Sequence, residues 1–201
     1  MCGIVSYLGK SDSVPILLKG LERLEYRGYD SAGLALIDGD NLSCIKQSGK
    51  VSELNSKIEK ISMKGSYGIA HTRWATHGPP NDTNAHPHLD QKGKIALVHN
   101  GIIENYSSIK MTLEGRGIEF TSDTDTEVLV QLISELYYNN DKKVSFENAV
   151  KAALQEVVGA YGIVAICVDE PGKMVAARMG SPLVLGVGDG EYLLASDASP
   201  I

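Results

Sequence analysis

The chain has 201 residues, of which 43% are hydrophobic and 22% are charged, and this composition argues against a disordered, collagen-like or coiled-coil protein. Its net charge of −6 gives no electrostatic reason to expect nucleic acid or an anionic membrane as a partner. The three cysteines are far apart and in no CxxC spacing, and the N-terminus has no signal-sequence pattern. We therefore expect a cytoplasmic protein without a membrane anchor, folded as one domain over residues 1–201.

The first third of the chain alternates short apolar runs with amphipathic segments. Residues 2–9 predict a buried strand, and a helix with Ser13 as its N-cap follows. Residues 31–47 predict a hairpin that turns at Asp38-Gly39, and a short helix is expected from Ser52.

The middle of the chain contains its longest irregular segment. Strands at 67–74 and 95–101 flank a connection of about twenty residues, and connections of this length are usually functional or disordered. Three helices follow, at about 105–115, 125–138 and 145–158. Thr124 and Glu127 have the spacing of a capping box at the start of the second of these helices.

The last third, residues 160–197, holds four short apolar strands with turn signals at Pro171-Gly172 and Asp189-Gly190. We interpret it as an antiparallel meander. The order of strands, then helices, then strands predicts an α+β fold with helices on the outer faces of sheets, and argues against an alternating βαβ fold.

Cys2 is the first candidate for chemistry. Chain termini are usually frayed, so an incidental thiol is the simplest interpretation, yet Cys2 opens a strand that should be buried. Removal of Met1 would leave a thiol and an α-amine of pKa about 7.7–8.0 on one residue, and this amine would accept the thiol proton.

The histidines form a second anomaly, because all five fall in one stretch: His71, His77, His86, His88 and His99. Their intervals match no zinc-finger or HExxH spacing, and no cysteine lies nearby, so a metal site is not favoured. The histidines of the long loop, His77, His86 and His88, would instead line a small-molecule pocket or bond to backbone groups.

Other polar residues suit the two charged groups of an amino acid. Arg73 can hold a carboxylate bidentately, with Thr76 and His77 as further donors, although a surface arginine beside a capping threonine is the alternative. Asp125 would pair with an ammonium, although the dipole of its helix favours a carboxylate there in any case.

Asn100 and Gly101 offer an amide and a backbone N–H to one oxyanion, although a strand-ending turn explains the same pair. Together with Cys2, Arg73 and Asp125, they describe an enzyme that attacks an amide of an amino acid.

Six motifs carry a resemblance to a known family: MCGIV, LEYRGYDSAG, AHTRWATHG, NAHPH, HNGIIEN and SDTDTEV. In this order, and over nearly the whole chain, they resemble the glutaminase domains of class II glutamine amidotransferases, in the branch of the glutamine–fructose-6-phosphate aminotransferases (glucosamine-6-phosphate synthases). The amidophosphoribosyltransferase branch is the second possibility, but it tends to carry RGQESAG and RYST forms. The resemblance implies the four-layer αββα sandwich of N-terminal-nucleophile hydrolases, with no cofactor and no metal.

The resemblance also implies roles for individual residues. Cys2 would attack the side-chain amide of L-glutamine, form a thioester and release ammonia, while Asn100 and Gly101 stabilise the oxyanion. The substrate-binding residues would be Arg73, Thr76 and His77 for the α-carboxylate, and Asp125, with the backbone of Gly101, for the α-ammonium.

Four more residues receive supporting roles from the same resemblance. Trp74 lies in the loop that closes over glutamine in this family, where an aromatic side chain would exclude water from the thioester. Arg27 is expected beside the nucleophile. His86 and His88, in NAHPH, would support the loop rather than bind a metal.

The complete enzymes of this branch continue into two sugar-isomerase domains, which bind fructose 6-phosphate, use the ammonia and make most contacts of a homodimer. We therefore expect these 201 residues to be the glutaminase part alone, able at most to hydrolyse glutamine to glutamate and ammonia. A non-catalytic glutamine-binding module is the alternative from another class. Cys44 and Cys167 lie in apolar strands and are expected to be inert thiols.

Overall fold

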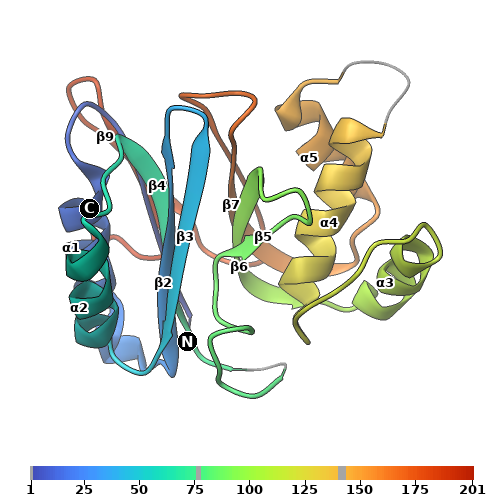
Figure 1. Cartoon of the computed structure of the whole chain (residues 1–201), viewed down its shortest axis with the longest axis horizontal. Helices are drawn as coiled ribbons and strands as arrows, with labels where there is room; N and C mark the ends of the chain where they lie inside the picture. The colour runs from blue at the N-terminus through green and yellow to red at the C-terminus, as the bar shows by residue number, and fades with distance from the viewer. Residues whose placement is uncertain (1, 76–77, 140–143) are drawn as a thin grey trace.

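The computed structural model describes residues 2–75, 78–139 and 144–201, which form two antiparallel sheets packed face to face (Figure 1). The first sheet has the order β3-β2-β4-β1-β10-β9 and consists of β1 (Gly3–Leu8), β2 (Ser31–Asp38), β3 (Asn41–Ser48), β4 (Tyr67–Arg73), β9 (Val184–Val187) and β10 (Tyr192–Ala195). The second sheet has the order β5-β6-β7-β8 and consists of β5 (His88–Leu89), β6 (Ile95–Ile103), β7 (Gly159–Cys167) and β8 (Met174–Met179).

Helices cover the outer face of each sheet. The first sheet carries α1 (Ser13–Leu24), followed by a short 3-10 turn at Glu25–Arg27, and α2 (Val51–Ile61). On the other side of the molecule lie α4 (Asp125–Tyr138) and α5 (Phe146–Gln155), with α3 (Tyr106–Glu114) beside α4. The layers follow one another as helix, sheet, sheet and helix, which confirms the predicted α+β fold and the αββα sandwich.

Three apolar cores separate the four layers, and the alternation of side chains along the strands explains them. In β1, Ile4 points into the core between the sheets, whereas Val5 points into the core under α1 and α2. In β7, Val164 belongs to the core between the sheets and Ile163 to the core under α4 and α5. A strand covered on both faces needs apolar side chains at successive positions, which is why these strands read as continuous apolar runs.

Helix α4 has the predicted bounds, Asp125–Tyr138, and a capped start. The hydroxyl of Thr124 accepts the N–H of Glu127 at 3.2 Å, as a capping box requires. The second half of the predicted capping box is wrong, because the Glu127 carboxylate bonds to Thr121 and Ser122. The N–H of Thr124 is directed instead to the hydroxyl of Ser122 at 3.3 Å.

Two predicted helix starts are corrected by one residue. Asp12, not Ser13, is the N-cap of α1, since its carboxylate accepts the N–H of Val14, while the hydroxyl of Ser13 donates to the carbonyl of Gly65 at 2.6 Å. Helix α2 begins at Val51 rather than at Ser52.

The last four strands do not form one meander. β7 and β8 pair in the second sheet, whereas β9 and β10 pair in the first sheet, where β10 lies next to β1. The chain therefore crosses from one sheet to the other between β8 and β9. The long connection after β4 also contains the short strand β5, which the sequence pattern did not predict.

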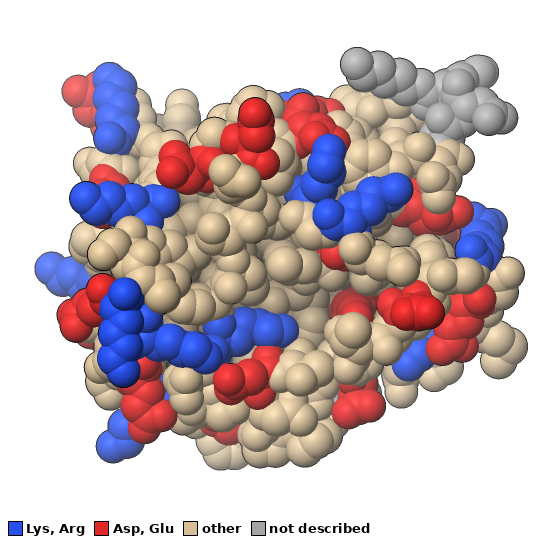
Figure 2. All heavy atoms as spheres, in the orientation of Figure 1, with Lys and Arg blue, Asp and Glu red and all other residues tan. Residues whose placement is uncertain are grey.

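The surface and the helices agree with the composition. On the face shown in Figure 2, Lys and Arg side chains are interspersed with Asp and Glu side chains. Within the described ranges, the helices lack the combination of length and apolar character that crossing a membrane would require.

Candidate active site

A cavity of about 450 Å³ brings together the residues singled out by the sequence motifs. Its walls include Cys2, Arg27, Arg73, Trp74, Asn100, Gly101 and Asp125. They come from the residue just before β1, the 3-10 turn Glu25–Arg27, the end of β4, the second half of β6 and the first turn of α4. Thr76 and His77, the two further predicted carboxylate ligands, lie outside the described residues.

The thiol of Cys2 faces the backbone of Trp74. Pairing of Gly3 with Thr72 in the first sheet places Cys2 beside the end of β4. The N–H of Trp74 donates to Sγ of Cys2 at 3.2 Å, and Sγ lies 3.5 Å from the carbonyl oxygen of Trp74. Burial raises the pKa of the Cys2 thiol, while the Trp74 amide and the charge of Arg73 act in the opposite direction. The thiol thus needs a base to become a nucleophile near neutral pH.

The carbonyl oxygen of Cys2 is held by two donors. Nδ2 of Asn100 donates to it at 3.2 Å, and Nη1 of Arg27 donates at 3.3 Å. Arg27 also forms an ion pair of 2.6 Å with Asp197, just beyond β10. The geometry places Arg27 against the backbone of the candidate nucleophile, where the resemblance led us to expect it.

Gly101 can only be glycine at this place in β6. Its φ angle is +135°, and a Cβ would collide with the carbonyl oxygen of Ala160 on the neighbouring strand β7. The absence of a Cβ lets the backbone of Gly101 lie against β7, and the residue lines the cavity next to Asn100. Two adjacent donor groups, one from a side chain and one from the backbone, are the arrangement that stabilises an oxyanion.

Opposite charges lie on different walls of the cavity. Arg73, at the end of β4, is only 3% exposed. Asp125, in the first turn of α4, is 6% exposed, and its Oδ2 accepts the N–H of Ile103 at 2.8 Å and lies 4.0 Å from Nδ1 of His99. A fixed cation and an anion in one small cavity match the carboxylate and the ammonium of a free amino acid.

Trp74 stands at the rim of the cavity. It is 53% exposed, and its ring lies so close to Gly28 that a Cβ there would be 3.0 Å from it. The carboxylate of Asp30, within the motif GYDSAG, accepts the N–H of Ala75 at 2.5 Å and anchors the chain directly after Trp74. Sequence reasoning missed this role of Asp30, although the motif contains it.

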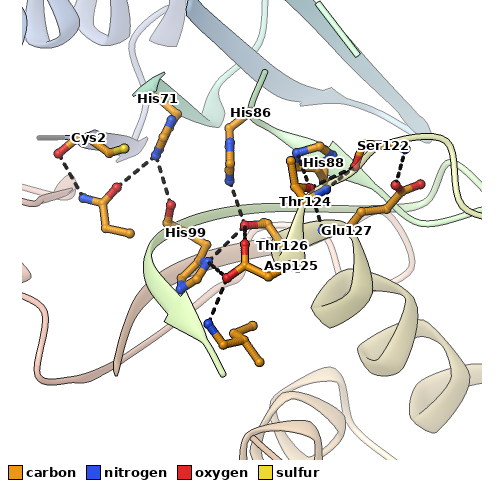
Figure 3. A network of polar contacts seen from close by, with 12 residues as sticks. Cys2, His71, His86, His88, His99, Ser122, Thr124, Asp125, Thr126 and Glu127 are labelled. Atoms are coloured by element: carbon orange, nitrogen blue, oxygen red, sulfur yellow. Dashed lines mark hydrogen bonds and ion pairs between the residues drawn. The ribbon is translucent and has the colours of Figure 1, made fainter. Parts of the chain in front are cut away.

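Under the cavity lie four buried histidines, here called the histidine layer: His71, His86, His88 and His99 (Figure 3). The rings of His71 and His86 stack with centroids 4.3 Å apart, and His88 meets His86 edge-on at 4.7 Å. Burial lowers the pKa of His71 to about 3 and lowers the pKa values of His86 and His88 well below their ordinary value.

Hydrogen bonds link the histidine layer to the start of α4. Nε2 of His86 lies 2.8 Å from the hydroxyl of Thr126, and Nε2 of His88 lies 3.0 Å from the hydroxyl of Thr124. These contacts tie the NAHPH segment to the first turn of α4, and support of the loop by the two histidines stays a prediction. In the described part of the chain, no group of three or more His, Cys, Asp or Glu side chains is placed to hold a metal ion.

Several cavity residues were not identified from the sequence as lining a site: His99, Ile102, Thr124, Thr126, Ser181 and Pro182. Thr126 and His99 belong to the motifs SDTDTEV and HNGIIEN, so these motifs hold the signal for them. Ser181 and Pro182 follow β8 and reach the cavity through the crossover between the sheets, which no local pattern records.

Comparison with known protein families identifies the family of this chain. Residues 71–201 match the family described as glutamine amidotransferase domain. The chain belongs to this family.

Its relatives and structural neighbours agree with the assignment. The chain is 54% identical over 204 residues to a glutamine–fructose-6-phosphate aminotransferase (isomerizing) of Chlorobaculum tepidum, and 55% identical over 202 residues to that of Bacteroides thetaiotaomicron. Each alignment covers 100% of this chain and 33% of the relative, so the chain spans about a third of the length of these curated proteins. The solved glutamine phosphoribosylpyrophosphate amidotransferase of B. subtilis, complexed with ADP and GMP, is 29% identical with a TM-score of 0.83, covering 99% of this chain and 42% of that one.

Proposed function

We propose that this chain hydrolyses the side-chain amide of L-glutamine through a thioester at Cys2, giving glutamate and ammonia. The observation that carries the proposal is that the cavity joins a thiol, a pair of oxyanion donors, a buried cation and a buried anion. The resemblance of the motifs and the family assignment support the same conclusion.

The substrate would be held by its α-amino-acid end. Arg73 binds the α-carboxylate and Asp125 the α-ammonium, so that the side-chain amide extends toward Cys2. Thr76 and His77 remain predicted carboxylate ligands. Trp74 then covers the bound glutamine, and the thioester is protected from premature attack by water.

The reaction proceeds in two displacements. Sγ of Cys2 bonds to the amide carbon, the thiol proton passes to the α-amine of Cys2 and from there to the leaving nitrogen, and the C–N bond breaks to release ammonia. Water then adds to the thioester carbon and the C–S bond breaks, which yields glutamate and restores the thiol. Asn100 and Gly101 donate to the oxyanion in both steps, and removal of Met1 is required because only a free α-amine is basic.

In the longer protein, we infer that the ammonia aminates fructose 6-phosphate to glucosamine 6-phosphate. This inference rests on the two relatives named above, whose remaining two thirds would be the sugar-isomerase domains of a homodimer. The competing acceptor is that of the phosphoribosylpyrophosphate amidotransferases, with which the chain shares its fold. A cytoplasmic location also remains a prediction.

The decisive experiment compares glutamate release from L-glutamine by the wild type, Cys2→Ala and Cys44→Ala. We expect Cys2→Ala to reduce turnover to the uncatalysed background and Cys44→Ala to retain it. Covalent labelling by a diazoketone analogue of glutamine, read by mass spectrometry, should locate the label on Cys2 and show that Met1 is absent. Wild-type turnover by Cys2→Ala, or by protein that retains Met1 throughout, would refute the mechanism.

Two further measurements separate the alternatives. If the chain is a non-catalytic glutamine-binding module, calorimetry will detect glutamine binding while no glutamate forms. The acceptor is identified by supplying glutamine to the longer protein together with either fructose 6-phosphate or phosphoribosyl pyrophosphate and measuring which one is aminated.

A further inference from the structure

The carboxamide of Asn100 has an N–H end and a carbonyl end of nearly the same shape. If the carboxamide flipped, its carbonyl oxygen would replace its N–H group beside Cys2. The oxyanion would then face a partial negative charge. The protein therefore has to fix the orientation of this one amide, and the contacts on its two sides show how this is done.

On the first side, Asn100 faces the backbone of Cys2. The carbonyl oxygen of Cys2 can only accept a hydrogen bond, so the Asn100 atom that lies 3.2 Å from it must be Nδ2. One N–H of Asn100 is used in this contact, and the other remains for the oxyanion.

On the second side, Asn100 faces His71. Nε2 of His71 lies 3.1 Å from the carbonyl oxygen of His99 and 2.9 Å from Oδ1 of Asn100. Since the carbonyl of His99 can only accept, Nε2 must carry the hydrogen. His71 is fully buried and burial lowers its pKa to about 3, so the ring is neutral near pH 7 and this is its single N–H.

We propose that His71 is a positioning residue for the reaction: its Nε2–H holds the carbonyl end of Asn100 and thereby directs the N–H end toward Cys2 and the oxyanion. This inference rests on the proposed glutaminase function. In none of these contacts does His71 touch Cys2 or the substrate-binding charges. The inference nevertheless gives this buried histidine a specific effect on the chemical step.

The position of His71 is itself well determined. Its ring stacks on His86, and Figure 3 shows it between Cys2 on one side and the rest of the histidine layer on the other. Among the described residues, Nδ1 of His71 has no hydrogen-bond partner, so all hydrogen bonding of the ring goes through Nε2.

The central test uses two substitutions with opposite expectations. His71→Phe keeps a flat ring for the stack on His86 but removes the donor, and we expect kcat for glutamate release to fall at least about tenfold while KM changes less than about threefold. His71→Gln supplies an amide with two N–H groups and should recover most of the lost kcat. A role in packing alone predicts the reverse order, because Phe preserves the ring and Gln does not.

His88→Phe is the matched control. His88 is equally buried and belongs to the same layer, but its Nε2 faces Thr124 and not Asn100. We expect it to lower the thermal midpoint to a similar extent as His71→Phe without the loss of kcat.

A double-mutant cycle then tests whether His71 acts through Asn100. In an Asn100→Ala background, measured in single turnovers, His71→Phe should cause no further loss. The same loss in both backgrounds would overturn the proposal, as would wild-type kcat in His71→Phe. If Cys2→Ala retains turnover, the proposed function itself fails, whereas an inactive Cys2→Ala with an unaffected His71→Phe refutes only the role of His71.

One measurement does not depend on any variant folding. Long-range ¹H–¹⁵N NMR spectra of the wild-type imidazoles at pH 7 should show His71 as the neutral tautomer protonated at Nε2. A tautomer protonated at Nδ1, or a charged ring, would overturn the proposal.

Discussion

Two cavities of this molecule each contain a cysteine, and only one of them has the features of a reaction site. The first, of about 450 Å³, contains Cys2, and the second, of about 610 Å³, contains Cys44. The larger cavity is therefore not the candidate active site, and the difference lies in how the polar groups around each thiol are used.

In the second cavity the two lysines are paired with other protein groups. Lys57 lies 3.5 Å from the carboxylate of Asp82, and Nζ of Lys46 donates to the carbonyl of Thr83 at 3.0 Å. Burial raises the pKa of Cys44 to about 11, so its thiol stays protonated near neutral pH. In the first cavity a backbone N–H points directly at the sulfur. The placement of donors, rather than volume, distinguishes the two sites.

The histidine layer lies between the two cavities. His86 and His99 line the first cavity and His88 lines the second. On the side of the first cavity, the histidine layer orients groups that take part in the proposed reaction. On the side of the second cavity, its contacts are structural. The following predictions use this contrast, beginning with the property that both sides share.

Acidification should destabilise the whole layer, and this is the largest effect that we expect. His71, His86 and His88 have folded-state pKa values below the unfolded value of about 6.5, so the folded protein takes up fewer protons than the unfolded chain at lower pH. Their stabilising contribution is complete above pH 6.5 and is lost as the pH falls below it, by about 1.4 kcal/mol per pH unit for each histidine and about 4 kcal/mol per pH unit for all three.

Urea unfolding between pH 7 and pH 5 measures this slope, in a range above the ordinary pKa values of aspartate and glutamate. His88→Phe should reduce the slope by about a third. A free energy of unfolding that stays constant over this range would contradict the assignment of neutral histidines.

Asn100→Ala and Gln131→Ala compare one carboxamide from each cavity, half-buried at Asn100 and buried at Gln131. Loss of Asn100 removes an oxyanion donor, and we expect kcat for glutamate release to fall about 10²–10³-fold with KM nearly unchanged. Gln131 accepts the N–H of Gln91 at 3.0 Å in the second cavity, so Gln131→Ala should lower stability and leave kcat within about twofold. Equal losses of kcat in the two variants would remove the functional distinction between the cavities.

Local sequence signals predicted the elements well where the determining contacts are local. The hydroxyl of Thr124 caps α4 and the glycine of Asp38-Gly39 turns the first hairpin, and both signals involve only neighbouring residues. The pairing of β10 with β1 involves residues far apart in sequence, 190 positions for Val5 and Ala195, so no window of the sequence contains it. The predicted meander failed for this reason.

The same distinction holds for the candidate site. Cys2, Asn100 and Asp125 were singled out by their motifs, and the structure brings them to one cavity; their roles as nucleophile, oxyanion donor and ammonium ligand stay predictions. The role of His71 was not found, because it depends on which atom of Asn100 it meets across the sandwich. Motifs thus identified the groups that would touch substrate, and only the folded chain identified the group that orients one of them.

Thr124 connects the two cavities and provides the smallest of the predicted effects. It lines the first cavity, while its hydroxyl accepts the N–H of Glu127 and contacts Nε2 of His88 at 3.0 Å, on the side of the second cavity. Thr124→Val keeps the shape of the side chain and removes the hydroxyl, so the helix loses its cap and His88 loses its contact with that hydroxyl. We expect a loss of about 1–2 kcal/mol in the free energy of unfolding, and Thr124→Ser should avoid most of it.

Ser145→Ala is the matched control, because Ser145 caps α5 through the N–H of Asn148 at 3.3 Å and lines neither cavity. Both variants should lose a similar free energy of unfolding in urea. Only Thr124→Val should also raise KM for glutamine, by up to about threefold, because Asp125 follows directly in the first turn that Thr124 caps. An unchanged KM in Thr124→Val would mean that the start of α4 holds Asp125 in place without this hydroxyl, and the connection between the two cavities would then be structural alone.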